Sequence, residues 1–230
     1  MVQTCDLARL RSNVYLTLAD LYLPPTVDTM SDAFILANRV SEDAFTMAPM
    51  AFYPTLNALV SRILALTETP MDAIARLYHG ANENGQSDDG PVPLLEAEYV
   101  GASTPKESAL LKSDLEYGYR NVGLDLSSTL PIEPDHAGAE CLYLGLLARL
   151  EADAWESQDF DTIDRVLQIE VAFLRDHPCQ WFPDLASLHT MRMPGSYLSD
   201  VSRAAHGMVV HDLSMLSAIY EKIETIATNS

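Results

Sequence analysis

Apolar residues recur every three or four positions through most of the chain, which is the spacing of amphipathic helices. The first apolar stripe begins at Leu7 and ends before Pro24, because the residue that precedes a proline is displaced from helical backbone angles. No segment shows the sustained alternation of apolar and polar residues that is typical of half-buried strands. The sequence therefore predicts an all-α fold, a compact bundle with helices over residues 7–21, 31–40, 54–64, 71–78, 105–119, 135–150, 161–176 and 196–228.

One tract interrupts the helical pattern. Residues 79–93 have the sequence HGANENGQSDDGPVP, and these residue types favour turns over helices. We expect a flexible connection here, either a surface loop within one domain or a hinge between two helical halves. The surface loop is the favoured interpretation, with residues 1–230 forming a single helical domain. A hinge would let two chains exchange halves, which is a route to a homodimer in equilibrium with the monomer.

The helix predicted from residue 135 carries the longest apolar stretch of the chain. Asp135 is a good N-cap, because its carboxylate can accept hydrogen bonds from the free N–H groups of the first turn. Glu140 and Arg149 interrupt the stretch, which is too short and too charged to span a membrane. We expect the buried stripe of this helix to consist of Leu142, Tyr143, Leu146, Leu147 and Leu150.

The chain is strongly acidic. It has 14 Lys and Arg residues against 33 Asp and Glu residues, a net charge of −19, and 48% of its residues are hydrophobic. Such a surface repels nucleic acids and anionic membranes, so neither is an expected partner, and it favours a cationic partner instead. Cys5, Cys141 and Cys179 lie far apart and form no Cys-x-x-Cys pair, which favours a reducing compartment. The N-terminus shows no signal-peptide pattern, so we expect a cytoplasmic protein without membrane insertion.

The familiar motifs of enzyme active sites are missing from the sequence. It contains no Gly-x-Ser-x-Gly, no Walker phosphate loop and no dinucleotide-binding glycine motif. Its six histidines include no His-Glu-x-x-His, and His206 and His211 are five residues apart, which turns them to different faces of a helix. We therefore predict no metal site, no cofactor and no catalytic residues.

One group of residues is a candidate binding site. Glu133, Pro134, Asp135 and His136 bring two carboxylates and an imidazole to a proline-fixed helix start. A charged histidine is disfavoured at the positive end of a helix dipole, so His136 should be neutral. An exposed acid beside a neutral imidazole suits recognition of a peptide backbone or a guanidinium group. The alternative is a structural role, in which Asp135 only caps the helix and His136 occupies its first turn.

The sequence Glu-Pro-Asp-His at a helix start, followed by HPCQWFP at residues 177–183, resembles the TorD/DmsD/NarJ family of cytoplasmic maturation chaperones for molybdenum-containing redox enzymes. The family pattern has a Pro-Asp-His corner, then a helix, then His-Leu-x-x-Trp-x-Pro. Further matching fragments occur in the family's order and extend over most of the chain. They are Arg11, Tyr15 and Leu18 in the first helix, Glu98-Tyr99, Pro105-x-x-Ser108, and Tyr119-x-x-x-Gly123.

The resemblance implies a TorD-like helical chaperone without catalytic turnover. Such a protein binds the N-terminal region of an apo molybdopterin oxidoreductase catalytic subunit, often a twin-arginine leader peptide, while the cofactor is inserted and before export or assembly. The residues expected to bind the client peptide are Glu133, Pro134, Asp135, His136, Tyr99, Ser108 and Tyr15. The alternatives are a guanine-nucleotide-binding helical switch, since some relatives bind such nucleotides weakly, and an unrelated helical regulatory protein. The missing phosphate loop weighs against the switch.

Overall fold

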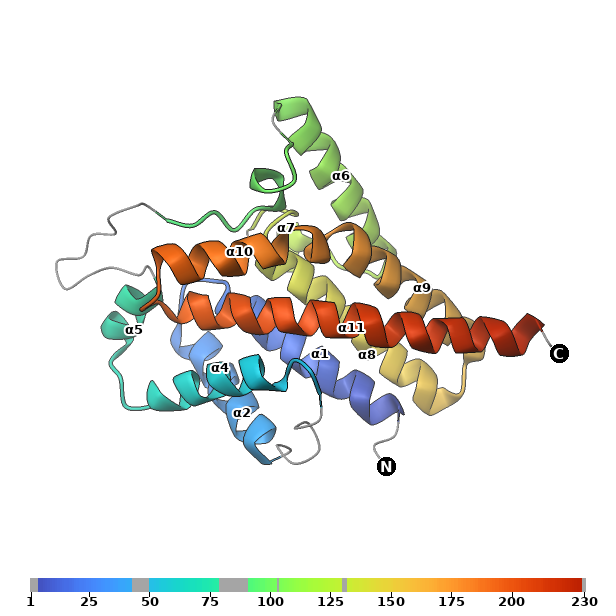
Figure 1. The fold of residues 1–230 in the computed structure, drawn as a ribbon, viewed down its shortest axis with the longest axis horizontal. Helices are drawn as coiled ribbons and strands as arrows, with labels where there is room; N and C mark the ends of the chain where they lie inside the picture. Colours follow the sequence, from blue (N-terminus) through green and yellow to red (C-terminus); the bar gives the residue numbers. More distant parts are fainter. Residues whose placement is uncertain (1–3, 43–49, 79–90, 103, 130–131, 229–230) are drawn as a thin grey trace.

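The computed structural model describes residues 4–42, 50–78, 91–102, 104–129 and 132–228 (Figure 1). Within these ranges there is no strand, only an isolated antiparallel bridge between Leu95 and His136. The predicted all-α class is confirmed. The elements in chain order are α1 (Thr4–Leu21), α2 (Val27–Glu42), α4 (Tyr53–Ala65), α5 (Met71–Tyr78), the 3-10 turn η1 (Glu96–Glu98), α6 (Pro105–Asn121), α7 (Leu126–Thr129), α8 (Ala137–Ser157), α9 (Phe160–Asp176), α10 (Pro178–Arg192) and α11 (Tyr197–Thr228).

Several helices differ from the prediction. The short α7 was not predicted, and α8 extends to Ser157, beyond the predicted end at residue 150. Helix α2 begins at Val27 rather than near Ser31, because the Thr26 hydroxyl accepts a hydrogen bond from the Thr29 N–H and supports an earlier first turn. Helix α10 was not predicted, since its sequence contains two prolines. Pro178 stands in the first turn, where a missing N–H costs nothing, and Pro183 lies inside the helix.

In the described part of the chain, α1 and α8 make the most extensive contact between two helices. A side chain at Gly145 would bring its Cβ within 2.8 Å of the Leu16 side chain, so only glycine lets the two helices approach this closely. At the same crossing, the Ser12 hydroxyl donates a 2.8 Å hydrogen bond to the Gly145 carbonyl. This contact holds α8 against α1 and fixes where the start of α8 lies.

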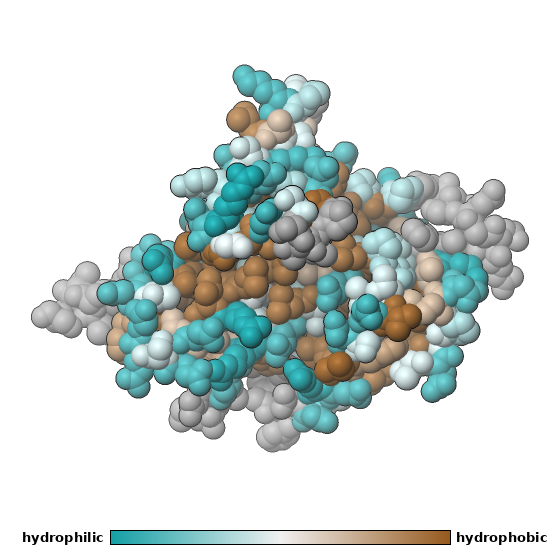
Figure 2. Space-filling view, turned by 180° about the vertical axis from the view of Figure 1, so that it is seen from behind, coloured by the Kyte–Doolittle hydropathy of each residue, from teal (hydrophilic) through white to brown (hydrophobic). Residues whose placement is uncertain are grey.

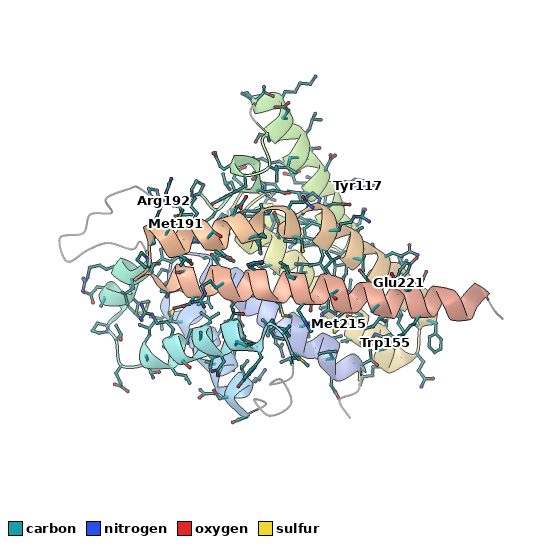
Figure 3. The ribbon with its side chains drawn as sticks, in the orientation of Figure 1. Tyr117, Trp155, Met191, Arg192, Met215 and Glu221 are labelled. Carbon is teal, nitrogen blue, oxygen red and sulfur yellow. The ribbon has the colours of Figure 1, made fainter. Side chains whose placement is uncertain are left out.

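A buried ionic cluster ties four helices together. Arg11 of α1 donates to Asp212 of α11 at 2.7 Å, to Glu170 of α9 at 2.8 Å, and to Glu151 of α8. All four side chains are buried. Trp155, near the C-terminal end of α8, adds a 2.9 Å hydrogen bond from its indole N–H to Glu151 (Figure 3). One positive charge therefore faces three carboxyl groups among side chains that are all buried.

The helices before and after residues 79–90 share one hydrophobic core. Buried residues of α1, α2, α4 and α5 belong to the same apolar cluster as those of α8 to α11. The Tyr78 hydroxyl donates to the Tyr22 carbonyl at 2.8 Å, and the Ser196 hydroxyl donates to the Tyr78 carbonyl at 3.1 Å. Most of the tract predicted to be flexible, residues 79–90, lies outside the described residues.

Helix α6 stands away from the rest of the bundle (Figure 1). Thr104 and Glu107 cap its N-terminus reciprocally, each side chain accepting a hydrogen bond from the other residue's backbone N–H. Only Leu115 and Tyr119 are buried on this helix, and Tyr117 projects from it into solvent (Figure 3). Across the described part of the chain, the helices are too short or too polar to cross a membrane.

Candidate functional site

The Glu133–His136 segment, hereafter the corner, is a tight turn fixed by hydrogen bonds to two other segments. Within the turn, the His136 N–H donates to the Glu133 carbonyl at 3.1 Å. The segment that leads into η1 pairs with the corner, because the Glu96 N–H donates to the Asp135 carbonyl at 2.8 Å and the Ala137 N–H donates to the Leu94 carbonyl at 2.9 Å. These bonds make the corner a rigid platform at the start of α8.

Helix α6 also supports the corner. The hydroxyl of Tyr119 donates a 2.8 Å hydrogen bond to the Pro134 carbonyl. The ammonium group of Lys112 lies 2.9 Å from a Glu133 carboxylate oxygen and 3.6 Å from Asp135 Oδ1. The Glu133 side chain is 60% exposed and that of Lys112 is 27% exposed, so their ion pair is at the surface.

The predicted capping role of Asp135 is wrong. His136, not Asp135, is the N-cap of α8: its backbone is extended, and its Nδ1 accepts a 3.0 Å hydrogen bond from the Gly138 N–H. Asp135 is 0% exposed, not exposed as expected, because the turn directs its carboxylate inward, where Oδ2 accepts from the Ala97 N–H at 3.4 Å. Burial raises the pKa of Asp135, and Lys112 and the Ala97 N–H partly offset this effect.

His136 is neutral at physiological pH, as expected, although the cause differs from the one predicted. Burial of the ring, rather than the helix dipole, lowers the pKa of His136 to about 4. A neutral ring is what its role requires, because Nδ1 can accept the Gly138 hydrogen bond only when it carries no proton.

Directly behind the corner lies a pair of buried acids that sequence reasoning did not single out. Glu140 of α8 accepts from the Trp181 indole N–H, with both carboxylate oxygens 3.2 Å away, and Glu96 lies 3.1 Å from His177 Nδ1. Burial and the neighbouring Glu96 raise the pKa of Glu140 well above its usual range, so this acid holds its proton. The sequence feature that could have revealed this pair is the position of Glu140 within an otherwise apolar stretch. An acid on the buried face of a helix needs hydrogen-bond partners from other segments.

The remaining predicted residues occupy different environments. Tyr99 is partly exposed, its ring stacks 5.2 Å from that of Trp181, and its hydroxyl donates to the Pro93 carbonyl at 2.8 Å. Ser108 is partly exposed and lies one helical turn before Lys112 on α6. Tyr15 is 0% exposed and belongs to the core of α1, near the carboxylate of Asp212. The structure therefore brings Tyr99 and Ser108 to the neighbourhood of the corner and places Tyr15 out of reach of a ligand.

Nothing in the geometry of the described residues indicates a metal centre. No group of three or more His, Cys, Asp or Glu side chains there is arranged to hold a metal ion. The corner offers instead an exposed carboxylate, a half-buried neutral imidazole and a backbone that is already hydrogen-bonded. A carboxylate can pair with a cationic group, and a neutral imidazole can donate or accept a hydrogen bond.

Comparison with known proteins identifies the family. The family model described as nitrate reductase delta subunit matches residues 51–187, which is more than half of the chain and includes η1, the corner and Trp181. No curated protein and no solved structure matches the chain. The chain belongs to the nitrate reductase delta subunit family, the NarJ/TorD-type maturation chaperones of molybdoenzymes.

Proposed function

We propose that this protein binds the N-terminal leader region of a molybdopterin oxidoreductase catalytic subunit while the cofactor is inserted, and that the corner receives a cationic side chain of that leader. The observation that carries the proposal is the ion pair between Lys112 and Glu133. The corner already holds one cation, supplied by the protein itself. An arginine of the leader would take the same place.

The exchange of Lys112 for a leader arginine is energetically reasonable. A surface ion pair such as Lys112–Glu133 stabilises the fold by only about 0–1 kcal/mol, and an incoming guanidinium group would replace the positive charge that Lys112 places 3.6 Å from the buried Asp135. A guanidinium group can bind a carboxylate through two parallel hydrogen bonds, which an ammonium group cannot do. The buried Asp135 adds negative charge beneath Glu133 without contacting solvent.

In this proposal the residues of the corner have distinct roles. Glu133 contacts the leader, His136 presents the partly exposed edge of a neutral ring, and Tyr99 offers a partly exposed aromatic surface nearby. Asp135 and Pro134 hold the turn in shape. The overall acidity of the chain draws a cationic leader toward the site, which raises the rate of association more than the affinity.

A pair of charge-removing variants tests the proposal. We expect Glu133→Gln to bind the client's leader peptide about 5- to 10-fold more weakly, equivalent to ~1 kcal/mol, since the variant loses the charge that pairs with arginine. Lys112→Met should bind at least as tightly as the wild type, because it removes the internal competitor. Isothermal titration calorimetry with the synthetic leader at low salt measures both.

The matched control is Glu116→Gln. Glu116 is likewise an exposed glutamate in a surface ion pair, with Arg120 on α6, but it lies outside the corner. This control should leave leader affinity unchanged. If Glu133→Gln and Glu116→Gln bind the leader as tightly as the wild type, the corner is not the leader site.

A further inference from the structure

Helix α8 buries a hydroxyl group that has no hydrogen-bond partner in the described part of the chain. Tyr143 and Leu147 are buried as predicted, whereas Leu142 and Leu146 are only partly buried and Leu150 is 40% exposed. Figure 2 shows hydrophobic side chains gathered below α6, on the face turned away from the viewer in Figure 1. Tyr143 is only 3% exposed, and its hydroxyl makes no hydrogen bond to another described residue. Buried polar groups are normally hydrogen-bonded, so this hydroxyl is a candidate contact for a ligand.

The hydroxyl faces a pocket of about 250 Å³ between α6, α8 and α9. A Cβ added to Gly118 of α6 would lie 3.7 Å from the Tyr143 hydroxyl oxygen, which places this oxygen at the wall that α6 contributes. One water molecule occupies ~30 Å³ in the liquid, so the pocket has room for a small organic group. The pocket shares no lining residue with the corner and is therefore a separate site.

Two aromatic rings form part of the pocket wall. The rings of Tyr143 and Phe173 meet edge to face, with their centroids 4.7 Å apart and their planes at 73°. The Phe173 ring also lies 4.9 Å from the ring of His177, which lines the pocket as well. The face of an aromatic ring carries partial negative charge and attracts a cation within ~6 Å. The aromatic wall therefore favours a cation over an anion.

Two acids add negative charge to the pocket. They are Asp114 of α6 and Asp176 of α9. Asp176 is paired with Arg175 through two 2.7 Å hydrogen bonds, whereas Asp114 has no ion-pair partner among the described residues. Within the part of the chain that the structure describes, neither lysine nor arginine lines the pocket. An anion would meet two acids here, and the net charge of −19 would repel it.

Hydrogen bonding narrows the class of cation further. Burial and the nearby carboxyl group of Glu170 raise the pKa of Tyr143 to about 12, so the hydroxyl is protonated at neutral pH. Its oxygen still accepts a hydrogen bond. An apolar ligand or a quaternary ammonium group has no N–H to donate and would leave this oxygen unpaired. An alkylammonium or alkylguanidinium group has such N–H groups, and its alkyl stem suits the apolar part of the wall.

We propose that the pocket between α6, α8 and α9 binds an organic cation that carries N–H groups, an alkylammonium or an alkylguanidinium. The Tyr143 oxygen accepts a hydrogen bond from the cation, and Asp114 pairs with its charge. Such groups occur in free molecules, for example polyamines, and in the lysine or arginine side chains of a partner protein. The inference does not rest on the proposed function, because the pocket and the corner have no residue in common.

Two probes of nearly the same shape test the role of charge. Butylguanidinium is a cation, whereas butylurea is neutral and has the same alkyl stem. Each is titrated into the wild-type chain, and the backbone amide shifts are followed by NMR. We expect butylguanidinium to shift the amides of Gly118 and Phe173 saturably and to bind at least fivefold more tightly than butylurea. This difference should shrink as salt increases, because Asp114 contributes through charge.

A matched pair of variants on α6 locates the binding. Gly118→Leu fills the pocket, and its Cβ meets Tyr143 at an ordinary contact distance. Leucine forms helix better than glycine does, so α6 should remain folded. We expect this variant to bind butylguanidinium at least tenfold more weakly. Ser113→Leu puts the same side chain at an exposed position of α6 outside the pocket and should change the affinity less than twofold.

Two conservative variants separate the contacts. Tyr143→Phe keeps the ring and removes only the hydroxyl, so it should bind butylguanidinium about fivefold more weakly without a fall in melting temperature. Asp114→Asn, at an exposed position, should bind it more weakly and with less dependence on salt.

Three results would overturn the inference: equal affinity for the two probes, binding of butylguanidinium by Gly118→Leu as tight as by the wild type, or equal losses in Gly118→Leu and Ser113→Leu. Glu133→Gln keeps this test apart from that of the proposed function. It should bind butylguanidinium at the pocket as the wild type does, so each site can fail while the other stands.

The leader peptide distinguishes the two sources of the cation. If Gly118→Leu binds the leader as tightly as the wild type, the ligand of the pocket is a free molecule. If Gly118→Leu binds the leader more weakly than Ser113→Leu does, a side chain of the client occupies the pocket.

Discussion

At the scale of single residues, the corner shows that the N-cap preference of a residue type does not decide which residue caps the helix. Asp135 is a strong N-cap type by sequence, and His136 is not. In the structure the turn from Glu133 to His136 places the Asp135 carboxylate under the Ala97 N–H, and the cap falls to the next residue. The location of the corner was predictable from sequence. The exchange of roles was not, because it depends on a segment 38 residues earlier in the chain.

The capping histidine makes the stability of the fold sensitive to acid. The pKa of His136 is about 4 in the folded state, below its ordinary value of 6.5. The neutral His136 cap therefore contributes its full share to the free energy of unfolding above pH 6.5. This share is lost as pH falls from 6.5 to 4, because in that range the histidine takes up a proton in the unfolded chain but not in the folded one.

We expect His136→Asn to lose less stability than the wild type between pH 7 and pH 5, because asparagine caps the helix but does not titrate. Urea unfolding at the two pH values measures the difference. His136→Ala separates the two contributions, since it should lower stability by ~1 kcal/mol at pH 7 through loss of the cap. The same pH dependence in His136→Asn and the wild type would contradict the assignment.

At the scale of elements, apolar spacing predicted most helices well. It predicted the bounds of α5 as observed, and those of α4, α6, α9 and α11 closely. It missed α10, where Pro178 and Pro183 are helix-breaking types by composition but are tolerated in their positions. It also assigned Leu150 to a buried stripe, because periodicity identifies an apolar face but not whether another element covers that face.

Apolar spacing could not predict the ionic cluster around Arg11, which joins several helices. Its members come from α1, α8, α9 and α11 and are far apart in sequence. Burial raises the pKa of Glu170 from its ordinary 4.5 to about 8. Glu170 therefore keeps its proton at neutral pH, which reduces the unbalanced negative charge around Arg11.

Titration of Glu170 changes the stability of the fold with pH in the direction opposite to that of His136. The folded state holds the Glu170 proton more tightly than the unfolded state, so stability falls as pH rises from 4.5 to 8. We expect Glu170→Gln to reduce that decline, because glutamine keeps an oxygen for Arg11 and carries no proton to lose. Urea unfolding between pH 5 and pH 8 measures this decline in stability, and Glu98→Gln, at an exposed position, is the control. A decline equal to that of the wild type would show that Glu170 is ionised throughout.

At the scale of the whole molecule, the fold class and the family were accessible from sequence, while the arrangement of the site was not. Helical periodicity and the absence of alternation gave the all-α class, and short motifs indicated the chaperone family. The buried pair Glu96 and Glu140, and the core position of Tyr15, follow from tertiary packing. A matching motif marks where a family's residues stand, but burial decides which of them a ligand can reach.

The central claim, that this chain is a maturation chaperone of a molybdoenzyme, predicts a preference for the client without its cofactor. The most direct measurement is co-purification with a molybdopterin oxidoreductase catalytic subunit, produced in cells that make molybdopterin and in cells that do not. We expect the chain to co-purify with the cofactor-free subunit and to be largely absent from the cofactor-loaded one. Equal recovery with both forms, or no association with either, would contradict the account.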